Sequence, residues 1–277
     1  MRKIDEKFVI DLISKTCIDI NTNLSEDIIF LLKKAQKKER CSTAKKILEL
    51  MSKNIQIAKK EALPICQDTG MVVVFVEIGN NIKLKDNTLE EIINRGVEKG
   101  YNNLRNSVVK NVFDSISNNN SPAVIHSRIV RGENLKLSIL AKGAGAENKS
   151  KLKMFNPTVK KEEIEDFIVK TVVEAGGQAC PPLVVGVGLG GNFEQAPLNA
   201  KKALTFQLPY KNPDFSLEQM QKSVLKKLNK TGLGPQGMGG DTTAIAVNII
   251  SAPRHIASFP VAVNLCCYLS RHKTIII

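Results

Sequence analysis

Apolar residues recur at helical spacing through most of the first sixty positions of the chain. The stretches 4–20, 25–38 and 42–60 place them three or four residues apart, which is the period of a helix with one buried face. The second stretch begins with Ser25 and two acidic residues, a common arrangement at the start of a helix. The pattern therefore predicts three consecutive helices.

Short apolar runs then begin to alternate with helical stretches. Residues 71–78 form an apolar run typical of a buried strand. Thr88 and Glu91 match a capping box, and the spacing after them predicts one long helix over 92–113. A polar turn and two strands are predicted next, at 117–122, 122–130 and 135–143.

The second half of the chain shows the same mixture, with glycine at most of the boundaries. A glycine-bearing loop is predicted at 142–157, followed by a helix at 158–177 that ends in two glycines. Ser216 and Gln219 are the predicted cap of a further helix, which runs to Gly232. Buried strands are predicted at 181–191, 244–250 and 260–265.

These elements predict an α+β fold in which a helical N-terminal region packs with a mixed-sheet lobe. The chain shows no internal repeat and no linker, so we expect a single domain over 1–277, with a helical lobe at 1–60 and a mixed α/β lobe at 61–277. No apolar run approaches the length of about 18 residues that a membrane span needs, and the N-terminus lacks the features of a signal peptide. We therefore expect a cytoplasmic protein.

The net charge of +13 raises the possibility of nucleic-acid binding. However, only 8 of the 40 basic residues are arginine, aromatic residues make up 5%, and there is no tryptophan. Phosphate-binding forks and base-stacking side chains are therefore scarce. The lysines mostly follow helical patterns such as KKAQKKER at 33–40, which is typical of a solvated face. The sequence favours neither nucleic acid nor a membrane as a partner, although a positive field would attract a small polyanion.

Three glycine-rich segments are candidates for ligand binding. GVGLGG at 186–191 matches the dinucleotide pattern after a strand, but Pro197 stands where the required helix would begin. GLGPQGMGGDTT at 232–243 lacks the lysine of a phosphate-binding loop. KGAGAENKS at 142–150 combines backbone N–H groups with lysines and could form an anion-binding concavity. The pattern favours a turn or a close backbone approach for GVGLGG and a solvated turn for KGAGAENKS in isolation. GLGPQGMGGDTT is equally consistent with a plain loop and with a close approach to a cofactor or substrate.

Cysteine provides the other candidate chemistry. The chain has six cysteines and no C-x-x-C pair, which removes the usual zinc-ribbon and thioredoxin interpretations. Cys66, Cys180 and the pair Cys266–Cys267 each stand at the edge of a strand, beside proline, glycine or polar residues. Iron–sulfur ligands come from such turns, although buried, inert thiols are the common alternative.

Several of these motifs together resemble one family. LPICQDTGMVVVFVEIG, NNLRNSVV, KGAGAENKS, GGQACPPLVVGVGLGG, LGPQGMGGDTTA and PRHIASFPVAVNLCCYLSRH occur in this order over nearly the whole chain. They resemble the α subunit of the class I, iron–sulfur-dependent fumarate hydratases and the related L-tartrate dehydratases. The resemblance implies an iron–sulfur hydro-lyase fold and a [4Fe–4S] cluster with one open iron. It implies Cys66, Cys180 and Cys267 as the cluster ligands, with Cys266 as a departure from the family pattern.

The same resemblance implies the remaining site residues. Asp68 takes an acid/base role, and Gln67 contacts the substrate. The other implied substrate-binding residues are Arg105, Lys142, Gly143 and His255. A guanidinium group such as that of Arg105 suits a carboxylate, and a small dicarboxylate is the implied substrate.

The resemblance also implies a partner. Further catalytic and substrate-binding groups of the family belong to a β part, so we expect a separate β subunit and an α2β2 assembly. The expected reaction is the reversible hydration of fumarate to L-malate, a step of the tricarboxylic acid cycle, with L-tartrate or mesaconate as alternative substrates. Two other classes stay open from the residues alone: a nucleotide-binding oxidoreductase and a basic nucleic-acid-binding protein.

Overall fold

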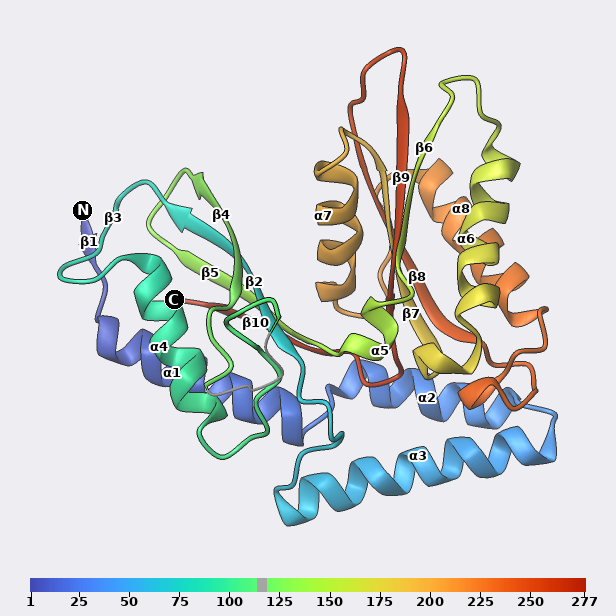
Figure 1. Cartoon of the computed structure of the whole chain (residues 1–277), viewed down its shortest axis with the longest axis horizontal. Helices are drawn as coiled ribbons and strands as arrows, with labels where there is room; N and C mark the ends of the chain where they lie inside the picture. The colour runs from blue at the N-terminus through green and yellow to red at the C-terminus, as the bar shows by residue number, and fades with distance from the viewer. Residues whose placement is uncertain (114–118) are drawn as a thin grey trace. The chain divides into compact units, whose positions relative to one another are not determined.

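The computed structural model describes residues 1–113 and 119–277 of the chain, as helices and mixed sheets (Figure 1). The α+β class is therefore confirmed. The chain forms two compact units, and each is described by itself. The first unit consists of Met1–Ser25, Ile55–Ala144 and Arg271–Ile277, and the second of Glu26–Asn54 and Gly145–Ser270. No helix of the described residues is long and apolar enough to cross a membrane.

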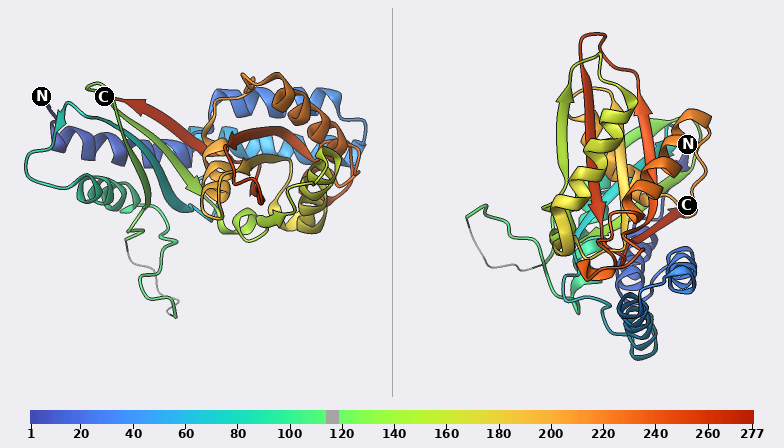
Figure 2. Two further views of the ribbon diagram at one scale, coloured as in Figure 1. Left: turned by 90° about the horizontal axis from the view of Figure 1, so that it is seen from above. Right: turned by 90° about the vertical axis from the view of Figure 1, so that its right-hand side faces the viewer.

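The first unit contains a four-stranded sheet in the order β10-β5-β2-β4, and the long strands are seen side by side in Figure 2. Strand β2 pairs parallel with β4 and antiparallel with β5, whose other edge carries β10 antiparallel. The strands are β2 (Met71–Gly79), β4 (Val124–Val130), β5 (Leu135–Lys142) and β10 (Arg271–Ile276). The short strands β1 (Arg2–Lys3) and β3 (Ile82–Lys83) pair with each other.

Helices α1 (Glu6–Thr22) and α4 (Leu89–Tyr101) share a core with this sheet. Alternate residues of β2, such as Val72 and Val74, pack against the apolar stripes of both helices, and none of this core is more than 9% exposed. The two helices lie very close together. A Cβ atom on Gly96 of α4 would come within 2.7 Å of the Cβ of Ile13 of α1, so this crossing requires a glycine.

The second unit contains a sheet in the order β6-β9-β7-β8, in which β7 runs parallel to β8 and antiparallel to β9. One face packs against α6 and α8 and the other against α7 (Figures 1 and 2). The strands are β6 (Lys151–Phe155), β7 (Leu183–Gly190), β8 (Ala244–Ala252) and β9 (Phe259–Cys266). The helices are α6 (Lys161–Ala175), α7 (Gln195–Lys202) and α8 (Phe215–Asn229).

Five further helical segments complete the chain. Helix α2 (Glu26–Lys38) belongs to the second unit, and the boundaries between the units fall within α3 (Ser42–Glu61) and α5 (Ala144–Glu147). The 3-10 turns η1 (Gly176–Ala179) and η3 (Pro235–Gly237) flank the start of β7, and η2 (Ala203–Thr205) follows α7.

The three N-terminal helices and the Thr88–Glu91 capping box are confirmed. The predicted long helix over 92–113 is wrong, because α4 ends at Tyr101. Beyond it, the carbonyl of Arg105 accepts a hydrogen bond from the hydroxyl of Thr69. This tertiary contact holds the segment as a loop.

Other differences lie in the second half of the chain. The predicted loop at 142–157 contains β6, which becomes a strand because it pairs with β9. The cap of α8 is Asp214, which accepts from the N–H groups of Ser216 and Leu217, rather than Ser216 itself. Helix α7 contains Pro197 in its first turn, where a missing N–H costs nothing, and β10 was not predicted. Residues 117 and 118 of the predicted polar turn lie outside the described residues.

Candidate functional site

The loop between α3 and β2 carries Cys66, Gln67 and Asp68, and buried side chains hold its backbone. The phenol of Tyr101 donates to the carbonyl of Thr69 at 2.8 Å, and the amide of Asn120 donates to the carbonyl of Gly70 at 3.1 Å. Burial raises the pKa of Tyr101, so its hydroxyl stays protonated and able to donate. The half-buried loop is therefore rigidly placed at the start of β2.

Both carboxylate oxygens of Asp68 accept backbone N–H groups. Oδ1 accepts from Gly70 at 3.0 Å, and Oδ2 accepts from Ala144 at 2.8 Å. The second bond joins this loop to the end of β5, where Lys142 is the last strand residue and Gly143 and Ala144 follow. The structure thus brings together two predicted site segments that are far apart in the sequence.

Two glycines permit this approach. Gly70 has a φ of +80°, and a Cβ there would come within 2.9 Å of the backbone of Lys142. A Cβ on Gly143 would lie 3.0 Å from Oδ2 of Asp68 and 3.5 Å from Nη2 of Arg271. A side chain at residue 143 would therefore crowd the Asp68 carboxylate, and Arg271 lies beside the same position.

Two predicted substrate-binding residues differ in exposure. Lys142 is 4% exposed, and its ammonium group donates to the carbonyl of Gly143 at 3.4 Å. Arg105 lies on the loop after α4 with an exposed side chain, and its backbone is bonded to Thr69, next to Asp68. Its guanidinium is thus the more accessible of the two cations.

The remaining candidate cysteines belong to the second unit. Cys180 has a φ of +56° and donates its N–H to the carbonyl of Gly177 at 3.0 Å, immediately before β7 begins. Because Val184 of β7 pairs with Cys266 of β9 in an antiparallel ladder, Cys180 and Cys267 lie at the same end of two neighbouring strands. The side chain of Cys266 is 3% exposed, whereas Cys180 and Cys267 are half-buried.

The glycine-rich segment at 232–243 packs against the turn at Cys180. Gln236, with a φ of +55°, donates its N–H to the carbonyl of Pro181 at 2.8 Å and its side-chain amide to the same oxygen at 3.1 Å. A Cβ on Gly177 would come within 2.7 Å of the carbonyl oxygen of Gln236. Gln236 was not predicted as a site residue, since it is one polar residue among glycines.

Glu39 anchors the other end of this segment. Its carboxylate is 1% exposed and accepts from the N–H of Asp241 at 3.0 Å and the hydroxyl of Thr242 at 2.8 Å. Burial works to raise the pKa of Glu39, but these bonds and those from the N–H groups of Cys41 and Arg40 hold it below its ordinary value. Glu39 was missed because it is the one acid within a lysine-rich stretch.

Replacing Glu39 with glutamine is expected to destabilise the protein by about 2 kcal/mol, because the new NH2 group would face N–H donors that then lose an acceptor. Urea denaturation at neutral pH measures this change. Glu49→Gln, which breaks only an exposed ion pair with Lys53, is the matched control and should be near neutral. Equal midpoints for the two variants would contradict the anchoring role.

His255 lies apart from the cysteines of its own unit. It is exposed in the turn between β8 and β9, where its Nδ1 accepts from the N–H of Ala257 at 3.1 Å. Cys266 and Cys267 are at the opposite end of β9, about 25 Å away at 3.3 Å per residue. Arg254 beside it donates to three carbonyls of the same turn and stabilises that turn.

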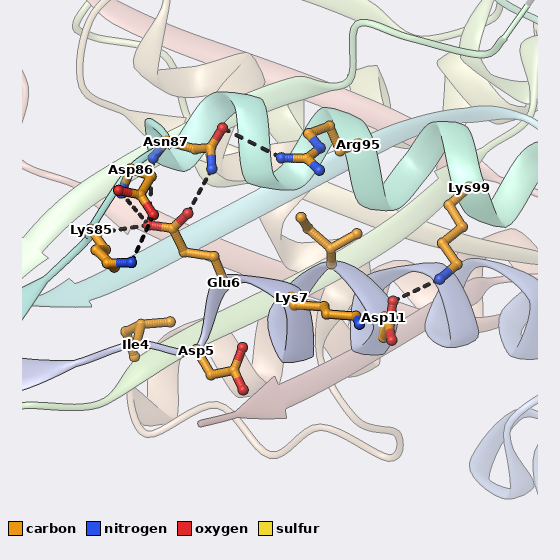
Figure 3. A pocket seen from close by; sticks show the side chains of 11 residues that line it. Ile4, Asp5, Glu6, Lys7, Asp11, Lys85, Asp86, Asn87, Arg95 and Lys99 are labelled. Carbon is orange, nitrogen blue, oxygen red and sulfur yellow. Dashed lines mark hydrogen bonds and ion pairs between the residues drawn. The ribbon is translucent and has the colours of Figure 1, made fainter.

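No predicted site residue lines the hollow of about 590 Å³ beside the start of α1 (Figure 3). Glu6 binds the segment before α4 there, accepting from the N–H groups of Lys85 at 2.7 Å and Asp86 at 2.9 Å and from the side chain of Asn87 at 2.7 Å. The side-chain bond from Asn87, followed by the backbone bonds, lowers the pKa of Glu6 from 4.5 to about 2.

Glu6→Gln is therefore expected to lower the thermal midpoint at pH 7, because the ionised form is the one that these donors stabilise. The folded pKa is depressed, so this stabilisation is complete above pH 4.5 and is lost as the pH falls toward about 2. The thermal midpoints of the wild type and the Glu6→Gln variant should therefore converge as the pH falls from 4.5 toward about 2. Glu90→Gln, on the exposed first turn of α4, should show no such convergence.

A backbone-held aspartate can exchange a proton, and half-buried cysteines at strand ends can bind iron, so these groups are ones that an enzyme could use. Over residues 10–276 the chain matches the family described as fumarate hydratase (Fumerase), and it belongs to that family. The family assignment made from the motifs is therefore confirmed.

Relatives of the chain carry names from the same group. The chain is 38% identical over 258 residues, 90% of each chain, to the "Putative L(+)-tartrate dehydratase subunit alpha" of Methanocaldococcus jannaschii. It is 28% identical over 265 residues to the L(+)-tartrate dehydratase subunit alpha of Escherichia coli K12, covering 93% of this chain and 87% of that one.

Proposed function

We propose that the chain is the α subunit of an iron–sulfur hydro-lyase that reversibly hydrates fumarate to L-malate. The observation that carries this proposal is the Asp68 carboxylate, which two backbone N–H groups hold against the segment at Gly143 and Ala144. Dehydration of L(+)-tartrate is the second candidate, favoured by the names of the relatives. Both reactions add or remove one proton and one hydroxyl group at adjacent carbons of a dicarboxylate.

The proposed ligands of a [4Fe–4S] cluster are Cys66, Cys180 and Cys267, because thiolates are the donors that such a cluster takes. All three side chains are half-buried, as is that of Cys41, whereas Cys17 is fully buried. Burial raises the pKa of Cys17 to about 12, so it stays a protonated, inert thiol. Among the described residues, no group of three or more His, Cys, Asp or Glu side chains forms a site for a single metal ion. When bound, the cluster would supply an open iron as a Lewis acid.

The chain's own residues would bind the substrate and move the proton. Asp68 is half-exposed, and each of its carboxylate oxygens keeps a lone pair beyond the bond that it accepts, so it can take up or deliver a proton. Arg105 would bind a substrate carboxylate through its guanidinium fork. Gln67, Lys142 and Gly143 are the other proposed contacts, and a β subunit would provide the rest of the site.

Anaerobic co-expression with a candidate β subunit tests the proposal. The complex is expected to turn over one of fumarate, L-malate, L(+)-tartrate or mesaconate, whereas the chain alone turns over none and binds the cluster poorly. Robust activity of the chain alone would contradict the need for a partner. Inactivity of an iron-loaded complex on all four acids would contradict the function.

Replacing the cluster ligands one at a time tests the cofactor. Serine at Cys66, Cys180 or Cys267 is expected to abolish the visible absorbance and iron content of the anaerobically reconstituted complex. Serine at Cys266 should leave both largely intact, because that side chain is buried within the strand. Cys41→Ser is the control thiol. Equal losses at Cys266 and Cys267 would contradict the choice of Cys267.

A further inference from the structure

Arg271 is a buried cation in the first unit. It lies in the motif PRHIASFPVAVNLCCYLSRH, but no role was predicted for it. It is the first residue of β10, pairs with Ala141 of β5, and is 3% exposed. In the part of the chain that the structure describes, no carboxylate forms an ion pair with it, and its Nε is buried without a hydrogen-bond partner. A buried guanidinium in this state is costly, so its retention calls for a role.

Its two hydrogen bonds lead to the Asp68 loop. Nη1 donates to the backbone carbonyl of Asp68 at 2.7 Å and to Oδ1 of Asn21 at 2.9 Å. Asn21, itself fully buried, donates to the phenol oxygen of Tyr101 at 3.2 Å, and Tyr101 donates to the carbonyl of Thr69. Arg271 thus holds two successive peptide groups of the loop, one directly and one through Asn21 and Tyr101.

The second terminal nitrogen of the guanidinium, Nη2, and the Asp68 carboxylate both lie beside Gly143. The position that a Cβ of Gly143 would take is 3.5 Å from Nη2 of Arg271 and 3.0 Å from Oδ2 of Asp68. The same side chain therefore fixes the Asp68 backbone and places a positive charge near its carboxylate. A lysine could keep the charge, but its single ammonium group could not occupy the Nη1 and Nη2 positions together. It would lose either the two bonds that Nη1 makes or the positive charge that Nη2 places beside Gly143.

We propose that Arg271 is the positioning residue for Asp68: its guanidinium fixes the Asp68 peptide so that the carboxylate keeps its place against the segment 142–144. The inference rests on the proposed function only in that Asp68 is taken to act on the substrate. Small displacements of a catalytic group can cost on the order of 100-fold in rate. The effect of losing Arg271 should therefore fall on turnover more than on binding.

Kinetics of the α/β complex and hydrogen exchange of the full chain test this together. Arg271→Lys is expected to lower kcat by roughly 10- to 100-fold with little change in KM or iron content. In the chain alone, the amides of Gly70 and Ala144, which donate to Asp68, should exchange faster while the interior of β2 stays protected. Lys273→Ala is the matched control, because Lys273 lies on the same strand as Arg271 and forms only an exposed ion pair with Asp19 of α1. This variant should change neither kcat nor the exchange of the two amides.

Unchanged kcat, or unchanged exchange at those two amides, would overturn the proposal. If Arg271→Lys does not fold, Asn21→Ala takes its place, because it removes one of the two acceptors and should give the same pattern to a smaller extent. A wild-type complex that is inactive on all four acids would defeat the proposed function, yet the exchange measurement would still decide whether Arg271 positions Asp68.

Discussion

Asp68→Asn is expected to lower kcat of the α/β complex by about 10²- to 10⁴-fold, the usual contribution of a general acid or base. Asparagine has nearly the same shape, but it cannot exchange a proton with the substrate at neutral pH. Its carbonyl oxygen can keep one of the two N–H bonds, from Gly70 or Ala144. Asp68 is half-exposed, unlike the buried Glu39, so water can accept from the other N–H group and the loop should stay in place. Iron content and the thermal midpoint should therefore be close to those of wild type.

Initial rates under anaerobic conditions, normalised to iron content, measure this effect. Asp19→Asn is the control, because Asp19 lies on α1 in the same unit and forms an exposed ion pair with Lys273. That change should leave kcat within about twofold, as a surface pair contributes little. If the Asp68→Asn complex retains a tenth or more of the wild-type kcat, Asp68 does not transfer the proton.

The largest expected effect on stability is at Gly188. A Cβ there would lie 2.0 Å from the carbonyl oxygen of Ala196 and 2.9 Å from the N of Ala200, both in the backbone of α7. Backbone atoms cannot rotate away, so α7 must move off the sheet and lose its contact with β7. Gly188→Ala should therefore cost about 3 kcal/mol, at the upper end for overpacking.

Chemical denaturation compares this variant with Gly132→Ala. At Gly132 a Cβ would meet nothing within 4 Å, but φ is +117°, so the control carries only a backbone cost of about 1 kcal/mol. A Gly188→Ala protein as stable as the control would show that α7 adapts to the added methyl group. Gly186, whose Cβ would lie 2.1 Å from the carbonyl oxygen of Ala200, should respond in the same way.

These contacts explain why GVGLGG resembles a nucleotide-binding pattern. Gly186 and Gly188 lie inside strand β7 and make room for a helix rather than for a phosphate group. The sequence shows that glycine is needed at these positions, but the partner that requires it comes from α7. Pro197 argued against a helix there, yet a helix tolerates proline in its first turn.

Local patterns were most informative where local forces decide the structure. Apolar spacing predicted the N-terminal helices, and the reciprocal bonds of Thr88 and Glu91 are made within a single turn. The prediction of helix to residue 113 failed because a distant hydroxyl, that of Thr69, binds the carbonyl of Arg105. Strand β10 was missed for the same kind of reason, since its partner β5 is more than a hundred residues away.

The candidate site shows the same contrast between features that local sequence predicts and features that depend on distant contacts. The motif around Cys66 and Asp68 and the segment at Lys142 were both singled out, and the structure joins them through one hydrogen bond. Of the side chains that support this arrangement, Asn21 and Tyr101 lie in ordinary helix patterns, and Arg271 stands in a motif that gave it no role. Their importance follows from where the fold places them, which no spacing rule encodes.

The division of the chain between the two units also bears on biosynthesis. The chain passes from one unit to the other at four places, after Ser25, Asn54, Ala144 and Ser270. Every residue of the second unit therefore leaves the ribosome before Arg271–Ile276, the strand that completes the first sheet. Until then the Asp68 loop lacks Arg271. The first unit therefore begins to be synthesised before the second, but it can finish folding only after the whole second unit has left the ribosome.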